Sequence, residues 1–298
     1  MTITRVNEGI QVYNYTPWFS YEENFDYSKY YEYHGRYWTI VFPIIGVYLG
    51  SIFWIQSLMR DRSPFALRSG LFYWNVALAV FSIGGAARSI PELYYTLKDL
   101  GLNHAICIQP YLHGVYGFWV VAFIISKFFE LGDTYFIVFR KQKLIFLHWY
   151  HHVTVIFCVF FTVTRELSTL RWYVTQNYAV HSIMYTYYAL RAVGMRIPKA
   201  ISISITSLQI LQMFVALFIT FYALFEKLAN RSCFVDNANI ALGLVCYGSY
   251  ALLFANFFRQ TYLNNITSRS KVTNAKVVSN NKTIIVSNNN VLNGKKRE

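Results

Sequence analysis

The segment ISISITSLQILQMFVALFITFYALF, residues 201–225, has no charged side chain and is rich in Ile, Leu, Val and Phe. A helix needs about 20 predominantly apolar residues to cross the hydrocarbon core of a bilayer, so this segment is long enough to span a membrane. It also carries Thr206, Gln209 and Gln212 at regular helical spacing. The segment therefore predicts a membrane-spanning helix with a polar stripe.

Similar apolar segments recur along the chain, which has 298 residues, 55% of them hydrophobic and 14% charged. This composition is too apolar for an ordinary soluble domain. It predicts an all-α membrane protein with an amino-terminal segment at 1–36, a membrane domain at 37–261 and a disordered polar tail at 262–298. The seven expected transmembrane helices lie at 38–59, 70–88, 114–139, 145–164, 172–190, 201–225 and 238–258.

Basic residues gather on one side of this expected membrane domain. The loops at 60–69, 140–143 and 191–199 and the tail from 259 carry seventeen Lys or Arg and two acidic residues, whereas the opposite side carries nine basic and ten acidic residues. By the positive-inside rule, the amino terminus lies outside the cytosol and the carboxyl terminus lies in it. The net charge of +13 is thus a topology signal and does not indicate nucleic-acid binding.

The carboxyl terminus carries Lys295 and Lys296, four and three residues from the end. This pattern resembles the dilysine retrieval signal of endoplasmic reticulum membrane proteins, which is read in the cytosol. It therefore predicts residence in the endoplasmic reticulum membrane with the orientation given by the loop charges.

Two kinds of residue on the expected lumenal side depend on that orientation. The sequons at Asn14 and Asn230 are candidates for glycosylation. Cys107 and Cys233 fall in the loops after the second and sixth spans, where an oxidising lumen permits a disulfide bond. We expect this disulfide as a hypothesis that thiol labelling can test.

Ionisable and amide side chains are costly to place inside membrane spans, so they mark a candidate functional site. Each of four consecutive spans carries a stripe of them at helical spacing. Polar stripes on neighbouring helices avoid lipid by turning toward one another, which predicts a shared polar chamber. The stripes contain Lys127, Glu130, Asp133 and Thr134; His148, His151 and His152; Asn177, His181, Met184, Tyr185 and Tyr188; and Thr206, Gln209 and Gln212.

The three histidines of the fourth span admit two chemistries. At this spacing they can coordinate a metal ion, but membrane di-iron desaturases and hydroxylases carry more histidines. This chain has seven, of which His34, His104 and His113 lie on the opposite side of the expected membrane domain. Imidazole also serves nucleophilic and acid–base catalysis near neutral pH, and we favour that chemistry, without a metal.

These residues resemble the motifs of the very-long-chain fatty acid elongases over about residues 60–262. At Trp149 the sequence resembles the branch of this family that acts on saturated and monounsaturated acyl chains. The matching motifs are, in order, Lys127-x-x-Glu130-x-x-Asp133-Thr134, His148-Trp-Tyr-His151-His152, Asn177-x-x-x-His181-x-x-Met184-Tyr185-x-Tyr187-Tyr188 and Thr206-x-x-Gln209-x-x-Gln212.

The resemblance implies that the later six helices surround an acyl tunnel and that the chain condenses a long-chain acyl-CoA with malonyl-CoA. The products are 3-ketoacyl-CoA, carbon dioxide and CoA, and no redox cofactor or metal is needed. The resemblance also implies three partners, the ketoacyl reductase, dehydratase and enoyl reductase of the cycle. It is compatible with a homo-oligomer.

His151 is the candidate nucleophile, forming an acyl-imidazole intermediate. Alternatively, His151 only orients or deprotonates malonyl-CoA in a ternary complex. The candidates that stabilise the enolate are His148, His152, His181 and Asn177. The expected supporting cluster is Lys127, Glu130, Asp133, Thr134, Tyr185, Tyr188, Gln209 and Gln212.

Basic residues in the expected cytosolic loops are candidates for binding the CoA phosphates, although ordinary loop charge also explains each of them. They are Arg140, Lys141, Lys143, Arg191, Arg196, Lys199 and Arg259.

Two other classes of function fit a polar stripe inside a membrane bundle. A transporter or channel is the alternative, but the chain lacks internal repeats and helices broken by Gly or Pro. A structural scaffold subunit would not need the histidines. Incorporation of malonyl carbon by membranes that contain the chain separates the three classes.

Overall fold

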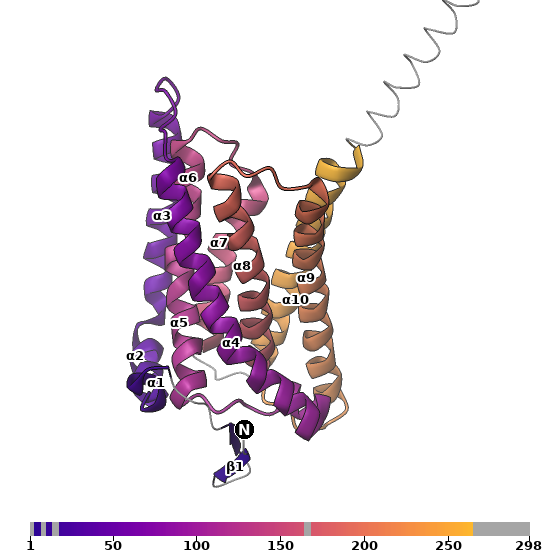
Figure 1. Cartoon of the computed structure of the whole chain (residues 1–298). Coiled ribbons are helices and arrows are strands. Elements are labelled where there is room, and N and C mark those ends of the chain that lie inside the picture. Colours follow the sequence, from indigo (N-terminus) through magenta and orange to yellow (C-terminus); the bar gives the residue numbers. More distant parts are fainter. Residues whose placement is uncertain (1–2, 7–9, 14–17, 164–167, 265–298) are drawn as a thin grey trace, which may run out of the picture. The chain divides into compact units, whose positions relative to one another are not determined.

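The computed structural model describes residues 3–6, 10–13, 18–163 and 168–264 of the chain, and most of them are helical (Figure 1). The helices are α1 Ser20–Glu23, α2 Tyr27–Tyr37, α3 Val41–Leu58, α4 Arg68–Cys107, α5 Gly114–Glu130, α6 Gly132–Phe139, α7 Phe146–Val163, α8 Leu170–Ala192, α9 Lys199–Leu228 and α10 Asn237–Phe258. Two short strands, β1 Ile3–Val6 and β2 Ile10–Tyr13, pair antiparallel before α1. The chain divides into two compact units, Met1–Leu252 and Leu253–Glu298, and the second contains the π-helical turn Arg259–Leu263.

Helical stretches in the described part of the chain have the length and composition needed to cross a membrane. Five qualify, namely Tyr27–Leu58, Arg68–Cys107, Gly114–Phe139, Lys199–Leu228 and Asn237–Leu263. Helix α7 is apolar but shorter, and α8 has 23 residues but carries the polar side chains of its stripe. The expected all-α membrane protein is thus confirmed, and each of the seven expected spans is helical.

The outer face of α9 shows what surrounds the bundle. Phe214, Phe218, Phe221 and Phe225 are each more than half exposed, and their spacing places them in one stripe along the helix. A contiguous apolar surface of this kind is costly in water and favourable in hydrocarbon. The stripe is therefore a lipid-facing surface.

Helix α4 continues well beyond the expected span at 70–88, because charges that end the apolar window find buried partners. Arg88 Nη2 lies 3.2 Å from Glu22 Oε2, in the amino-terminal segment, and both side chains are buried. Glu92 Oε1 accepts from Arg171 Nε of α8 at 2.8 Å. Paired charges can be buried where isolated charges cannot, so the helix continues past Pro91. It is interrupted at Gly101, whose φ of 83° is not helical, so the expected absence of helices broken by Gly or Pro is wrong for α4.

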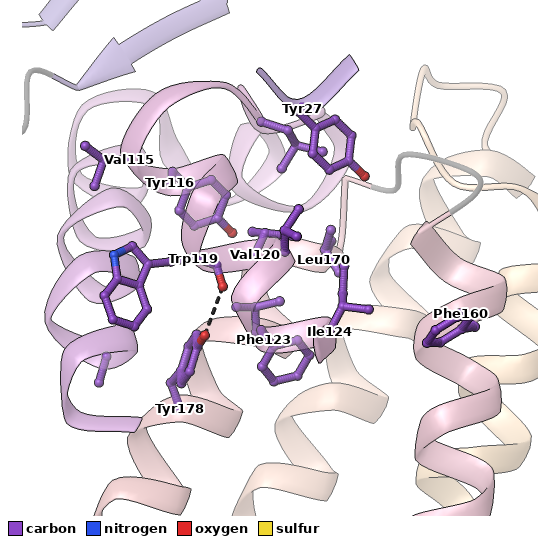
Figure 2. Packing of buried hydrophobic residues seen from close by; sticks show 14 of the residues in the cluster. Tyr27, Val115, Tyr116, Trp119, Val120, Phe123, Ile124, Phe160, Leu170 and Tyr178 are labelled. Atoms are coloured by element: carbon purple, nitrogen blue, oxygen red, sulfur yellow. Dashed lines mark hydrogen bonds between the residues drawn. The ribbon is translucent and has the colours of Figure 1, made fainter. Parts of the chain in front are cut away.

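Aromatic and branched side chains of α5 and α8 build the largest apolar cluster, part of which Figure 2 shows. Val120 and Ile124 of α5 are fully buried, and the Tyr178 hydroxyl donates to the carbonyl oxygen of Trp119 at 2.9 Å. A Cβ atom at Gly85 of α4 would lie only 2.2 Å from the Tyr178 ring. Glycine at this position is what lets α4 approach α8 closely.

The ends of α4 and α9 are joined by a disulfide bond between Cys107 and Cys233, whose Cα atoms are 4.2 Å apart. Cys233 lies between α9 and α10, and the next residue, Phe234, donates its N–H to the Cys107 carbonyl oxygen at 2.9 Å. Cys107 is fully buried in a second apolar cluster with Ile106, Ile219 and Ala223. The bond therefore fixes this end of α4 against the connection between α9 and α10.

Removing the disulfide should lower the thermal stability of the protein in detergent. Losing a native disulfide typically costs about 2–5 kcal/mol, and this one joins residues 126 positions apart. We expect Cys107→Ser to lower the melting temperature, and a reductant to do the same to the unmodified chain. The double variant Cys107→Ser/Cys233→Ser is the control, because reductant should no longer change its melting temperature. Equal melting temperatures of the unmodified chain with and without reductant would contradict a stabilising role.

Candidate functional site

Two charged side chains of α5 pair with each other inside the bundle. Lys127 Nζ lies 2.6 Å from Glu130 Oε1, and both side chains are almost completely buried. The same ammonium group donates to Asn177 Oδ1 of α8 at 2.9 Å, and Ser126 Oγ donates to Glu130 at 3.3 Å. Because each charge has hydrogen-bonding partners, the pair can be retained away from water.

The direction of these hydrogen bonds defines the protonation of His181. An ammonium group can only donate, so the amide oxygen of Asn177 faces Lys127 and its Nδ2 faces His181. Nδ2 donates to His181 Nε2 at 3.3 Å, so that nitrogen is unprotonated and the ring carries its proton on Nδ1. Nδ1 lies 3.7 Å from Glu130 Oε1. The hydrogen-bond network thus runs from Lys127 of α5 to Asn177 and His181 of α8, and His181 Nδ1 faces Glu130 without a hydrogen bond.

The three histidines of α7 lie beside this network. The ring centroids of His148 and His152 are 4.6 Å apart, and those of His151 and His152 are 5.7 Å apart. His148 Nε2 is 3.0 Å from Thr134 Oγ1 of α6, whereas the His151 ring lies 5.0 Å from the ring of Tyr250 on α10. The imidazoles therefore turn inward but contact different helices.

Asp133 of α6 is held by two neutral donors. Tyr185 of α8 donates its hydroxyl to Oδ2 at 2.8 Å, and Trp74 of α4 donates its indole N–H to Oδ1 at 2.7 Å. The polar stripes of the sequence include Asp133 and Tyr185 but not Trp74. The signal for Trp74 is weak, since a lone tryptophan in an apolar span gives no sign that its N–H meets a carboxylate 59 residues away in sequence.

A cavity runs beside the histidines between α5, α7, α8, α9 and α10. Its empty volume is about 870 Å³, part of it open to the surface. Along α7 the lining side chains are His151, Val155, Val159 and Thr162, so the cavity follows this helix for about three turns, or roughly 16 Å. Most of the wall is apolar. At the His151 end, the polar side chains are Asn177, Gln212 and Tyr250.

Some members of the expected stripes do not join the site. Of the stripe on α9, Gln212 lines the cavity, whereas Gln209 donates to Met184 Sδ at 3.1 Å and Thr206 donates to the Ser202 carbonyl oxygen at 3.0 Å. A spacing of three residues falls about 60° short of a full helical turn, so side chains that repeat it rotate away from a common face. Tyr188, near the end of α8, is 42% exposed.

Among the residues with described positions, no three His, Cys, Asp or Glu side chains are grouped so that they could hold a metal ion. Cys158 and Cys246 line the cavity with their Sγ atoms 2.6 Å apart.

The basic residues proposed for CoA binding lie at the connections between α6 and α7 and between α8 and α9, at the same end of the first unit (Figure 1). Lys141 Nζ donates to the carbonyl oxygens of Arg60 and Arg62, at 2.9 and 3.0 Å. This side chain therefore links the loop after α6 to the loop after α3. Arg140 is half-buried. The exposed members are Lys143, Arg191, Arg196 and Lys199.

The remaining expected residues lie outside this arrangement. Arg259 belongs to the second unit, where it donates to Asn256 Oδ1 at 3.1 Å. Asn230 is exposed at the end of α9, and Asn14, Lys295 and Lys296 lie outside the described residues.

Comparison with known proteins identifies the family. The model of the ELO, or GNS1/SUR4, family matches residues 34–270. The chain is 44% identical over 254 residues to very long chain fatty acid elongase 6 of Drosophila melanogaster, covering 84% of this chain and 80% of that protein. It is 40% identical over 255 residues to elongase 6 of Gallus gallus (85% and 96%) and 38% identical over 259 residues to elongase 3 of Homo sapiens (87% and 92%). The chain with this buried histidine site therefore belongs to the ELO (GNS1/SUR4) family, the family that contains these fatty acid elongases.

Proposed function

We propose that the protein is a 3-oxoacyl-CoA synthase that condenses a long-chain acyl-CoA with malonyl-CoA in the first step of fatty acid elongation. One observation carries the proposal: of the four histidines in the site, His151 is the one that lines the elongated apolar cavity. A cavity of this kind suits an acyl chain, which leaves water for an apolar wall. Its thioester would then lie at the polar end, beside the imidazole.

In this mechanism His151 acts as the nucleophile. A nitrogen lone pair of its ring attacks the thioester carbonyl carbon, the C–S bond breaks, and CoA leaves as the thiolate. Malonyl-CoA then binds and loses carbon dioxide, which leaves an enolate. The enolate carbon attacks the acyl-imidazole, releases His151 and forms the 3-ketoacyl-CoA. This order of events predicts ping-pong kinetics.

The network behind His151 supports the same chemistry. Asn177 lines the cavity and is held by the buried ammonium group of Lys127, so its amide is fixed before substrate arrives. Preset dipoles that need no rearrangement are the most effective stabilisers of developing charge. We therefore assign Asn177 to the enolate or thioester oxygen, and Lys127 and Glu130 to orienting Asn177 and His181.

The proposed position of CoA follows from the direction of the cavity and from the loop charges. The acyl chain would extend from His151 toward Thr162, so the CoA head group would leave the site at the opposite end. That end carries the basic connections after α6 and α8 (Figure 1). If it faces the cytosol, as the positive-inside rule predicts, acyl-CoA reaches the site from the cytosol and the protein resides in the endoplasmic reticulum membrane. The expectation of saturated or monounsaturated acyl chains rests on the resemblance at Trp149.

Replacing His151 should abolish both elongation and the covalent intermediate. With palmitoyl-CoA alone, the unmodified protein should gain the mass of one acyl group, and His151→Ala should not. Elongation with radiolabelled malonyl-CoA should fall by at least about a hundredfold. His104→Ala, at the far end of α4, is the control and should keep both. An acyl-enzyme formed by His151→Ala would remove the nucleophile role, and elongation without any acyl-enzyme in the unmodified chain would favour the ternary complex.

The length of the acyl chain should depend on Val159, which lies in the middle of the cavity wall on α7. Val159→Phe fills part of the cavity, so we expect the ratio of activities to shift from palmitoyl-CoA toward lauroyl-CoA. Val153→Phe makes the same change on the same helix at a residue that does not line the cavity, and it should keep the original ratio. An unchanged ratio in Val159→Phe would show that the acyl chain lies elsewhere.

Variants of the buried Lys127–Glu130 ion pair should change the stability of the protein and its elongation activity in different ways. Lys127→Met leaves Glu130 buried without its partner, which typically costs about 3–5 kcal/mol and should lower the melting temperature in detergent. The double variant Lys127→Met/Glu130→Gln removes the unpaired charge and should recover most of that loss. Elongation should stay low in both variants, because Asn177 has lost the donor that orients it. Recovery of elongation in the double variant would show that the pair is only structural.

A further inference from the structure

Helix α3, the first membrane-spanning helix, contributes a hydroxyl group that reaches the histidine site. Tyr48 is 3% exposed, and its hydroxyl oxygen lies 2.7 Å from Thr134 Oγ1 on α6. Thr134 is fully buried, and the same Oγ1 lies 3.0 Å from His148 Nε2 on α7. The three groups form a continuous chain of hydrogen bonds across three helices, and we call this chain, Tyr48–Thr134–His148, the relay. None of the motifs in the sequence includes Tyr48.

The number of protons in this chain fixes its direction. Tyr48 and Thr134 each have one hydroxyl proton to donate. If His148 donated to Thr134, three protons would share the two contacts of the chain, so the hydroxyl proton of either Tyr48 or Thr134 would have no acceptor in it. A buried donor without an acceptor is costly. In the opposite direction every proton is used: Tyr48 donates to Thr134, and Thr134 donates to His148 Nε2.

We propose that Tyr48 is a positioning residue that, through Thr134, holds His148 as the tautomer with an unprotonated Nε2 and a proton on Nδ1. The hydrogen bond at one ring nitrogen decides which nitrogen carries the proton. His148 and His152 lie with their ring centroids 4.6 Å apart, so the ring held by Thr134 is part of the imidazole cluster. As far as it concerns elongation, the proposal rests on the condensation function proposed above.

The same two helices provide a matched control. One turn further along α3, Ser51 Oγ donates to the Tyr48 carbonyl oxygen at 2.9 Å and lies 2.6 Å from the hydroxyl of Tyr135 on α6. This second contact also joins α3 to α6 through a tyrosine hydroxyl, but it does not involve a histidine. Tyr48→Phe and Tyr135→Phe therefore remove the same atom between the same helices, and only the first interrupts the chain to His148.

The first test compares these variants by steady-state kinetics in detergent or reconstituted membranes. Tyr48→Phe should lower kcat for malonyl incorporation by about tenfold, which is the order expected for the loss of one hydrogen bond. KM for palmitoyl-CoA and malonyl-CoA should stay unchanged, because neither Tyr48 nor Thr134 lines the cavity proposed for the substrate. Tyr135→Phe should keep both parameters. Equal kcat values in the two variants would overturn the positioning role.

A double-mutant cycle tests whether Tyr48 acts through Thr134. Thr134→Val interrupts the relay at its centre, so adding Tyr48→Phe should lower kcat no further. Multiplied effects in the double variant would mean that Tyr48 acts by another route and would overturn the proposal. Melting temperatures of all variants identify any that lose activity because they are poorly folded, and those of Tyr48→Phe and Tyr135→Phe should agree.

A second measurement does not depend on elongation. With Nε2 engaged by Thr134 and Nδ1 protonated, His148 should react slowly with diethyl pyrocarbonate, as read by peptide mass spectrometry. Tyr48→Phe should speed modification of His148, and Tyr135→Phe should leave its rate unchanged. If the unmodified chain does not elongate acyl-CoA, the condensation function fails, and this comparison still decides whether the relay exists. Equal modification rates in both variants would overturn it.

Discussion

The structure depends on one constraint: a polar group inside a lipid-facing bundle must find its partners within the bundle. The Lys127–Glu130 pair meets this constraint in the site, because each charge has the other at 2.6 Å and a further hydrogen bond from or to a neutral group. From it the direction of the network follows, since the ammonium group orients Asn177, and Asn177 orients His181. The contacts that hold these helices together also hold the candidate site. The site is therefore built into the helix packing and is not added to it.

The same constraint explains how far the sequence could predict the fold. Apolar windows found every helix of the membrane domain, and the polar stripes identified the helices that meet around the histidines. The windows failed at the end of α4, because an isolated Arg88 or Glu92 ends an apolar segment while a paired one does not. The pairing depends on Glu22 and Arg171, which are distant in sequence, so a local sequence pattern cannot predict it.

Within the site, the side chains of the four polar stripes were predictable, and single neutral donors outside the stripes were not. Trp74 and Tyr48 lie in segments that look uniformly apolar or aromatic, yet each places one N–H or O–H against the polar cluster. Conversely, regular spacing alone placed Gln209 and Tyr188 in the chamber, and neither of them lines the cavity beside His151. Helical spacing gives a face of the helix. The points where helices cross decide which positions along that face contact a neighbouring helix.

The buried Glu92–Arg171 contact has a consequence for biosynthesis. Glu92 leaves the ribosome 79 positions before its partner, so the translocon must handle α4 while that carboxylate is still unpaired. Arg88 differs, because Glu22 has already been made when Arg88 emerges. Chains are synthesised from the amino terminus, so α4 cannot reach its final packing until α8 has been inserted. The half of α4 that carries Glu92 must therefore keep this carboxylate hydrated or protected until α8 supplies Arg171.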